Sequence, residues 1–206
     1  MESLSIQEAL ARLTSSLQPG QRYLLGLAGA PGAGKSTVAQ QLMAAFPGRA
    51  VVVPMDGYHL ANTELARLGI AGRKGAPDTF DSAGYVVMLA RLRQRPDGVV
   101  VYAPEFRREI EEGVAGAIAV PPEIELVITE GNYLLLDQGH WAGVQEHLDA
   151  VWFIDIDDNL RRERLVARHM HYGRTAGEAA AWVAHTDEPN AVLVQASRVR
   201  ADIAVG

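Results

Sequence analysis

A glycine-rich loop at residues 29–37 carries the pattern with the clearest chemistry in this sequence. The loop reads Gly29, Ala30, Pro31, Gly32, Ala33, Gly34, Lys35, Ser36 and Thr37, which fits the spacing G-x-x-x-x-G-K-[ST]. Glycines let the backbone wrap around phosphate oxygens, so that consecutive N–H groups point at them. We expect Lys35 to reach the β- and γ-phosphates and the Ser36 hydroxyl to coordinate Mg²⁺. The loop therefore predicts a nucleotide site, with ATP and Mg²⁺ as the cofactors.

The segments on either side of the loop have the character that such a site requires. Residues 23–28 form a short apolar run typical of a buried strand, and residues 36–46 place Val38, Leu42 and Phe46 along one face of a helix. A strand, a loop and a helix in this order aim the N-terminus of the helix at phosphate. A glycine-rich turn that matched by chance would have no reason to carry both flanks.

Two acidic residues follow predicted strands, at the edge where an open α/β sheet binds ligands. Glu130 comes directly after the apolar run 124–129, and we expect it to complete the Mg²⁺ site, although an acid that begins a helix would occupy the same place. Asp56 lies just beyond the strand 50–54 and before Gly57. A kinase must deprotonate its acceptor hydroxyl, and Asp56 is suited to be that base. A turn-forming Asp-Gly pair is the alternative for Asp56.

An arginine-rich helix is expected to begin at residue 158 or 159. At about 100° per residue, Arg161, Arg164 and Arg168 fall within one narrow arc, and Arg174 follows the helix. A hinged helix with such a face could close over the transferring phosphoryl group, so we predict a lid at about residues 158–178 and a role for Arg174 in nucleotide binding. A basic face that is merely solvated is the alternative.

The acceptor is expected to bind between Asp56, the loop 72–81 and the segment 102–108. The side chains predicted to line this region mostly form hydrogen bonds: Tyr58, His59, Asp81, Tyr102, Glu105, Arg107 and Arg108. A site that selects an alcohol through hydrogen bonds discriminates strongly against analogues that lack it. The set favours a polyhydroxylated acceptor, such as a sugar, over a nucleoside that would use an apolar slot for its base. Because tyrosine and arginine side chains also stack on bases, a nucleoside remains an alternative acceptor.

The elements expected along the chain indicate an α/β fold. Helices are predicted at residues 3–17, 36–46 and 60–68, from 81 or 82 to 92, from 158 or 159, and at 175–182. Strands are predicted at residues 23–28, 50–54, 99–102, 114–120, 124–129, 150–154 and 201–205, with 99–102 pairing with 114–120. Strands that alternate with helices make a mostly parallel sheet in a three-layer fold. We see no linker or repeat, and we expect one domain over residues 1–206.

Length and composition narrow the class of protein. The chain has 206 residues, 48% of them hydrophobic and 21% charged, which is typical of one globular domain. It contains no cysteine, so a disulfide framework and a thiolate metal site are excluded. The net charge of −6 argues against a broad nucleic-acid surface. No apolar run approaches the roughly 20 residues of a membrane span, and no signal-peptide pattern opens the sequence. We expect a cytoplasmic protein with neither nucleic acid nor membrane as partner.

Five motifs occur in the order seen in the phosphoribulokinase, uridine kinase and pantothenate kinase family. They occupy residues 29–37, 55–59, 74–81, 129–133 and 197–202. The chain resembles this family over roughly residues 20–205, and especially bacterial uridine-kinase-like proteins named as fructose transport system kinases. The resemblance implies a P-loop nucleotide-kinase-like fold with a central parallel sheet and a mobile lid. It also implies Asp56 as catalytic base, Glu130 as the acid of the Mg²⁺ site and Arg168 as the catalytic arginine of the lid.

The resemblance does not identify the acceptor. Uridine kinases usually follow the lid arginine with aspartate, whereas this chain has His169, and residues 187–190 only loosely resemble the asparagine-bearing stretch of pantothenate kinases. We expect an ATP-dependent kinase for the hydroxyl of a small alcohol, with a sugar such as fructose favoured and a nucleoside or pantothenate as alternatives. A homodimer is a further expectation.

A regulatory, ATP-binding NTPase is the alternative of another class. A GTPase would need a lysine in an Asn/Thr-Lys-x-Asp motif. Lys35 and Lys74 are the only lysines, and neither lies in such a motif.

Overall fold

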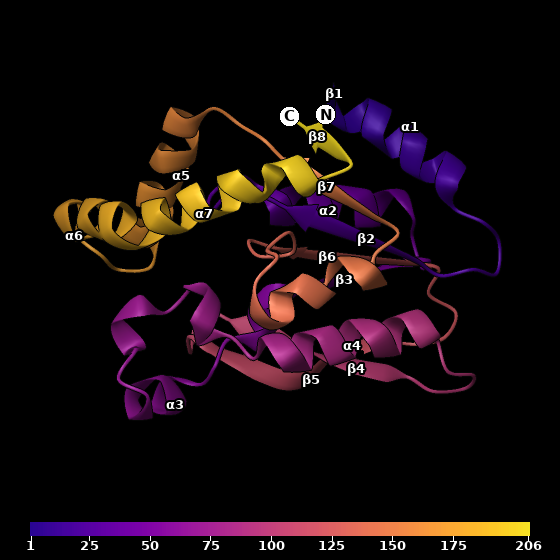
Figure 1. Cartoon of the computed structure of the whole chain (residues 1–206), viewed down its shortest axis with the longest axis horizontal. Coiled ribbons are helices and arrows are strands. Elements are labelled where there is room, and N and C mark those ends of the chain that lie inside the picture. Colours follow the sequence, from indigo (N-terminus) through magenta and orange to yellow (C-terminus); the bar gives the residue numbers. More distant parts are fainter.

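The structure is a computed structural model that describes residues 1–206, and its centre is a six-stranded sheet (Figure 1). In spatial order the strands are β1 (Glu2–Leu4), β8 (Ile203–Val205), β7 (Ala150–Ile154), β2 (Tyr23–Ala28), β6 (Leu126–Gly131) and β3 (Ala50–Pro54). All neighbouring pairs are parallel. The carboxyl ends of β2, β6 and β3 therefore meet at one edge.

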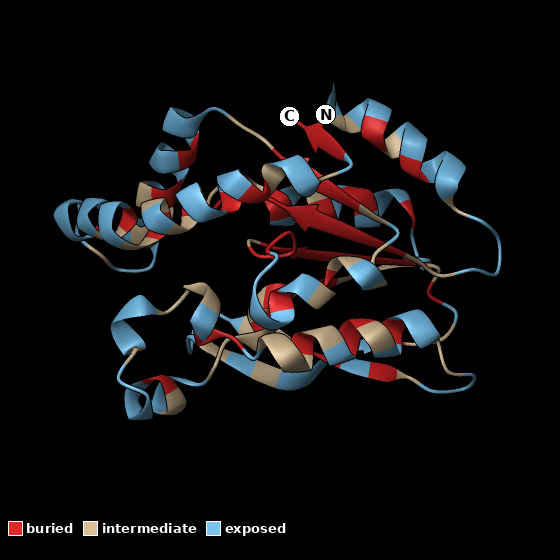
Figure 2. Ribbon diagram, in the orientation of Figure 1, coloured by how far each residue is buried: buried red, intermediate tan, exposed pale blue.

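Successive residues of the central strands contribute to two separate cores. Leu24 of β2 and Val127 of β6 belong to one core, whereas the next residues, Leu25 and Ile128, belong to the other. Apolar side chains on both faces are typical of a parallel sheet that helices cover on both sides. Figure 2 shows this arrangement, with central strands that are buried along their length and helices that alternate between buried and exposed residues.

Helices cover both faces of the sheet. On one face lie α1 (Ile6–Ser16) and α2 (Lys35–Ala45), whose buried residues include Leu13 and Leu42. On the other lies α4 (Ser82–Gln94), which contributes Tyr85 and Leu89 to the larger core. The short α3 (Asn62–Arg67) lies in the connection from β3 to α4. The three-layer α/β prediction is confirmed.

An antiparallel pair, β4 (Val101–Arg107) and β5 (Glu112–Val120), lies beside α4 (Figure 1). It meets the 3-10 turn Met55–Tyr58 closely: a Cβ built on Gly57 would come within 2.4 Å of the carbonyl oxygen of Pro104. A side chain at position 57 would push the two segments apart. Gly57 therefore lets the end of the hairpin lie next to Asp56.

Three helices near the C-terminus lie at the same edge of the molecule (Figure 1): α5 (Asp158–His171), α6 (Ala176–Trp182) and α7 (Glu188–Ser197). Asp157 caps α5 by accepting hydrogen bonds from the backbone N–H groups of Asn159 and Leu160, at 2.9 and 3.1 Å. A π-helical turn, Val183–Asp187, joins α6 to α7. Such turns occur frequently at functional sites.

The boundaries of some elements differ from the sequence prediction. Residues 2–4 form the edge strand β1, because Ser5 caps α1 in a capping box with Glu8 and starts the helix later than expected. The hairpin strands extend to Arg107 and Glu112, beyond the predicted bounds at residues 102 and 114. Helix α7 was not predicted. None of the helices is both long enough and apolar enough to span a membrane.

Candidate functional site

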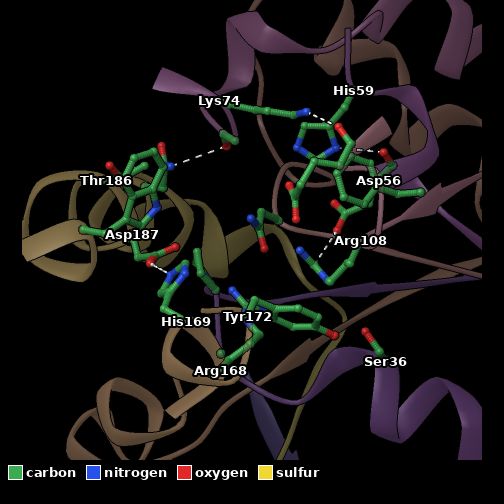
Figure 3. Close-up of a pocket in the computed structure, with 18 of the residues that line it drawn as sticks. Ser36, Asp56, His59, Lys74, Arg108, Arg168, His169, Tyr172, Thr186 and Asp187 are labelled. Atoms are coloured by element: carbon green, nitrogen blue, oxygen red, sulfur yellow. Dashed lines mark hydrogen bonds and ion pairs between the residues drawn. The ribbon is translucent and has the colours of Figure 1, made fainter. Parts of the chain in front are cut away.

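A cavity of about 600 Å³ lies at the carboxyl ends of β2, β3 and β6. The glycine-rich loop lines it from the sheet, the loop around Lys74 and the end of the hairpin line it on a second side, and α5 with the π-helical turn line it on a third. Figure 3 shows labelled side chains from all three sides pointing into the space between them. Most of the lining residues are polar or charged.

The glycine-rich loop has the backbone conformation that a phosphate cradle needs. Gly32 and Gly34 have φ angles of 81° and 94°, in the left-handed region that glycine favours. Gly34 directly precedes α2, so the loop leads into the N-terminus of a helix. A Cβ on Gly32 would lie 2.7 Å from the Leu165 side chain of α5. The loop therefore packs closely against α5.

Lys35 lies buried at the base of the loop, and protein oxygens surround its ammonium group. Its Nζ donates hydrogen bonds to the carbonyl oxygens of Gly29 and Ala30, at 2.9 and 3.1 Å, and to Oδ1 of Asn132 at 2.7 Å. Burial lowers the pKa of Lys35, while the Glu130 carboxylate opposes that shift. The charge is thus held at the end of β6 by neutral oxygens that phosphate oxygens could replace.

Ser36 and Glu130 form a pair of oxygen ligands beside Lys35. The Ser36 hydroxyl donates to Oε1 of Glu130 at 2.9 Å, and Glu130 is 8% exposed. Burial, then the nearby Asp56 carboxylate, raise the pKa of Glu130, so a bound cation would stabilise its ionised form. Hydroxyl and carboxylate oxygens suit Mg²⁺, which is usually held by one or two protein groups together with substrate phosphates and water. The donor set fits the predicted ion.

Asp56 lines the same cavity from the turn after β3. Its only ion-pair contact is with Arg108, at 3.5 Å between Nη2 and Oδ2. The backbone carbonyl oxygen of Asp56 lies 2.8 Å from Nδ1 of His59, which fixes the imidazole ring beside it. Burial lowers the pKa of His59 below its ordinary value of 6.5, so the ring is neutral at pH 7. Asp56 is therefore accessible, weakly paired and close to a neutral ring.

The C-terminal helices supply cations that lack carboxylate partners. Arg164, Arg168 and Arg174 line the cavity, and none makes an ion pair with a carboxylate of the chain. Burial, then the nearby Arg108, lower the pKa of Arg168, although a guanidinium stays charged in proteins. The Arg174 guanidinium lies 3.8 Å from the centre of the Trp182 ring. These charges suit an anionic ligand.

Arg161 differs from its neighbours on the predicted arc, and its expected place on the phosphate-facing surface is wrong. Its side chain is 3% exposed and forms ion pairs with Asp158 at 2.9 Å and Glu188 at 2.6 Å. It also donates to the carbonyl oxygen of Pro31 at 3.4 Å. Helical periodicity placed the three arginines on one arc but could not show that α7 covers the first of them. Arg161 joins α5, α7 and the loop.

Only two of the predicted acceptor residues, His59 and Arg108, line the cavity. Asp81 caps α4, and Tyr102 is 56% exposed on the outer face of the hairpin. The others also lie outside the lining set: Tyr58 packs against Tyr85, and Glu105 pairs with Arg107 at 3.4 Å.

Sequence reasoning missed several lining residues. They are Asn62, Phe80, Phe106, Asn132, Tyr172, Trp182, Thr186, Asp187 and Asn190. His169 and Lys74 also line the cavity, and His169 lies 2.8 Å from Asp187 between Nε2 and Oδ2. Signals were available for four of them: Asn132 and Phe80 lie in the recognised motifs 129–133 and 74–81, and Asp187 and Asn190 bound the stretch compared with pantothenate kinases. The remaining residues lie on loops and helices that no periodicity brings together.

A second cavity, of about 310 Å³, lies on the other side of the glycine-rich loop. It shares Gly34, Thr37 and Arg164 with the first cavity. Apolar side chains form much of its lining: Val38, Ile154, Ile156 and Val205. The loop therefore stands between a polar cavity and a more apolar one.

Comparison with known proteins gives a consistent result. Residues 24–203 match the model of the phosphoribulokinase / uridine kinase family. A Schizosaccharomyces pombe protein provisionally named a uridine kinase is 34% identical over 97% of this chain and 89% of its own. The uncharacterised Escherichia coli protein YggC is 33% identical over 98% of this chain and 86% of its own.

Solved structures agree with the sequence matches. A kinase from Silicibacter sp. TM1040, provisionally named for the fructose transport system, superposes with a TM-score of 0.88 at 35% identity and covers 98% of both chains. YFH7 of Saccharomyces cerevisiae shares the fold, with a TM-score of 0.80 at 19% identity over 98% of this chain and 97% of its own. The chain belongs to the phosphoribulokinase / uridine kinase family of P-loop kinases.

Proposed function

We propose that the protein transfers the γ-phosphoryl group of ATP to a hydroxyl group of a small alcohol. Membership of a kinase family supports a phosphotransferase. The observation that carries the finer proposal is that Asp56 lines one cavity together with Lys35, Ser36 and Glu130. A base, a phosphate cradle and a metal-binding pair around one space are the parts that transfer to an alcohol requires.

We propose that the nucleotide binds across both cavities, with its phosphates and its base on different sides of the loop. The triphosphate would follow the loop, with backbone N–H groups and Lys35 on its oxygens, and the γ-phosphate would enter the larger cavity. The base would occupy the smaller, more apolar cavity, where Val38 and Ile156 offer contact surface and Arg164 borders both spaces. Arg164 and Arg174 would contribute charge along the phosphates. Thr37, which lines both cavities, lies where the two parts of the nucleotide join.

Asp56 is proposed as the general base. Its carboxylate accepts the proton of the acceptor hydroxyl as that oxygen forms its bond to the γ-phosphorus. The bond from the γ-phosphorus to the bridging oxygen breaks, and ADP carries away the electron pair. The weak pairing of Asp56 leaves a carboxylate oxygen free for this proton. Arg168 faces the same space without a carboxylate partner and would stabilise the charge on the transferring group.

Ser36 and Glu130 would hold Mg²⁺. When bound, the ion neutralises charge on the β- and γ-phosphate oxygens. The buried Glu130 carboxylate and the Ser36 hydroxyl are already hydrogen-bonded to each other, so little rearrangement is needed to direct both oxygens to one cation. In this arrangement Lys35 would approach the phosphates from the strand edge, while Arg168 would approach from α5.

The acceptor is proposed to be polyhydroxylated, such as a sugar or a sugar derivative. Most of the residues that line the cavity are polar or charged, and the His59 ring already packs on Phe80, with 3.9 Å between ring centres. The provisional name of the Silicibacter protein points the same way. A nucleoside and pantothenate are the alternatives, since relatives carry the names of both kinds of kinase.

An acceptor screen tests this function. Purified protein with Mg²⁺ and ATP would be assayed for ADP release with ketoses, aldoses, nucleosides and pantothenate. Stimulation by a polyol or sugar derivative supports the proposal. Turnover that no acceptor changes would instead show a regulatory NTPase. Phosphorylation of only uridine or pantothenate would keep the kinase and reject the sugar.

A further inference from the structure

Two cations lie on the side of the cavity that faces away from the loop, and they come from different segments of the chain. Lys74 belongs to the loop after α3, and Arg108 follows the last residue of β4. Both lie over the ring of Phe106, at 5.2 Å for Nζ of Lys74 and 5.5 Å for Cζ of Arg108. We call Asn62, Lys74, Phe106 and Arg108 the acceptor wall. Figure 3 shows Lys74 and Ser36 on opposite sides of the cavity.

The Lys74 ammonium has neutral hydrogen-bond partners only. It donates to Oδ1 of Asn62 at 2.6 Å and to the backbone carbonyl oxygen of Glu111. An ammonium has three donors, so one is left for a ligand. No carboxylate forms an ion pair with Lys74, and the Glu112 carboxylate nearby accepts from the backbone N–H of Asn62 instead. Burial lowers the pKa of Lys74, and the nearby Glu112 and Glu111 carboxylates oppose that shift.

The acids that line the cavity near this wall are Asp56, Asp187 and Glu111, and the Glu111 carboxylate forms no ion pair. Asp187 is hydrogen-bonded to His169, and Asp56 is reserved for the acceptor proton in the proposed reaction. Arg108 makes only the 3.5 Å contact with Asp56 and presents five N–H donors in a planar fork, which suits a carboxylate or a phosphate. When Asp56 takes up a proton, Arg108 loses this partner, so a second anion beside it would be stabilising.

We infer that the alcohol acceptor carries an anionic group, a carboxylate or a phosphate ester, which Lys74 and Arg108 bind while its hydroxyl faces Asp56. This inference rests on the proposed kinase function. It narrows the acceptor from polyols in general to sugar acids, sugar phosphates and small hydroxy acids. A neutral sugar such as fructose would leave Lys74 without an ion-pair partner and Arg108 with only its 3.5 Å contact to Asp56.

Matched acceptors test the inference. ADP release would be measured with glycerol, glycerate and glycerol 3-phosphate, and with fructose, gluconate and fructose 6-phosphate. We expect at least one anionic member to have a kcat/KM at least about 10-fold above that of its neutral counterpart, as befits hydrogen bonds to a charged group. The carboxylate and phosphate members distinguish the two anions. A neutral acceptor that is turned over as well as its anionic counterparts would overturn the inference and leave the kinase intact. No stimulation by any member of either series would overturn this inference, whereas the proposed function would fail only if the nucleosides and pantothenate of the acceptor screen were not phosphorylated either.

Two substitutions locate the effect. Lys74→Gln should raise the KM for the anionic acceptor at least about 10-fold and change the KM for ATP little. Lys74→Arg keeps the charge and should recover part of the loss, which a purely structural role of Lys74 would not predict. Arg73→Gln is the matched control, because Arg73 is the exposed neighbour, pairs with Asp78 and does not line the cavity. Equal effects of the Lys74→Gln and Arg73→Gln substitutions would contradict the assignment.

Discussion

The glycine-rich loop side of the cavity and the acceptor wall are built differently. On the loop side, Lys35 has three oxygen partners, and Ser36 is bonded to Glu130 at the end of the strand β6. On the acceptor wall, Lys74 and Arg108 come from a loop and from the segment beyond a hairpin strand, and their charges have few partners. The central sheet thus fixes the groups proposed to bind phosphate, while connecting segments hold those proposed to select the acceptor. Function-specific residues commonly lie on such segments.

The largest expected effect follows from removing the charge on the loop side. Lys35→Ala should reduce phosphoryl transfer by at least about 10³-fold, because it removes the charge proposed to bind the β- and γ-phosphates. Circular dichroism should stay near that of the wild type, because Lys35 belongs to neither of the two hydrophobic cores. Arg49→Ala, which removes an exposed arginine paired with Glu125, is the control. A Lys35→Ala variant that is unfolded would give no support to a catalytic role.

The next effect lies where the two sides meet. Asp56→Asn keeps the shape of the side chain and removes the base, so kcat should fall by about 10²–10⁴-fold while the Kd for ATP changes little. Asp97→Asn, at an exposed residue away from the cavity, should have no effect on either quantity. Normal turnover of the Asp56→Asn variant at saturating substrate would show that Asp56 is only a turn residue.

Two arginines of α5, Arg168 and Arg161, are expected to have different roles, one in catalysis and one in the stability of the fold. Arg168→Ala should lower kcat and kcat/KM together by about 10²-fold, because the stabilisation it removes arises in the transition state. Arg161→Ala should instead lower the free energy of unfolding by about 2 kcal/mol, since it removes the 2.6 Å contact with Glu188, which keeps its pair with Arg162 at 3.0 Å. Chemical denaturation and steady-state kinetics of both variants check this. A change confined to the KM for ATP would move the catalytic role to Arg164 or Arg174.

The smallest effect concerns pH and the metal site. The folded protein raises the pKa of Glu130 above its ordinary value of 4.5, so the native state gains stability from protonation as the pH falls through the raised value. Glu130→Gln lacks this group. Without nucleotide or metal, the variant should be the more stable protein at neutral pH, and the difference in Tm should shrink on acidification. The variant should also need more Mg²⁺ for turnover. A Tm difference that does not depend on pH would contradict the raised pKa.

The loop side was largely predictable from the sequence, because its residues follow strands directly. Gly29–Thr37, Asp56 and Glu130 each come at the carboxyl end of an apolar run, and a parallel sheet brings such ends to one edge. The acceptor wall was not predictable in the same way. Strand alternation turns Tyr102 outward between the buried Val101 and Ala103, and only the fold reveals this orientation.

The C-terminal helices show a second limit. Periodicity placed Arg161 and Arg168 on one arc, but the partner that buries Arg161 lies on α7, which the sequence did not reveal as a helix. His169 and Asp187 are likewise 18 residues apart in the sequence. His169 lies on α5, and Asp187 lies in the π-helical turn that joins α6 to α7. The burial of Arg161 and the contact between His169 and Asp187 both depend on segments that are distant in the sequence. Neither helix propensity nor residue spacing predicts such contacts.

The fate of the γ-phosphate tests the central claim most directly. With γ-labelled ATP, Mg²⁺ and the acceptors of the screen, the protein is predicted to transfer the label to an alcohol phosphate ester, and the Asp56→Asn variant should lose this product. Label that appears only as inorganic phosphate, at a rate that no acceptor changes, would contradict phosphoryl transfer to an alcohol.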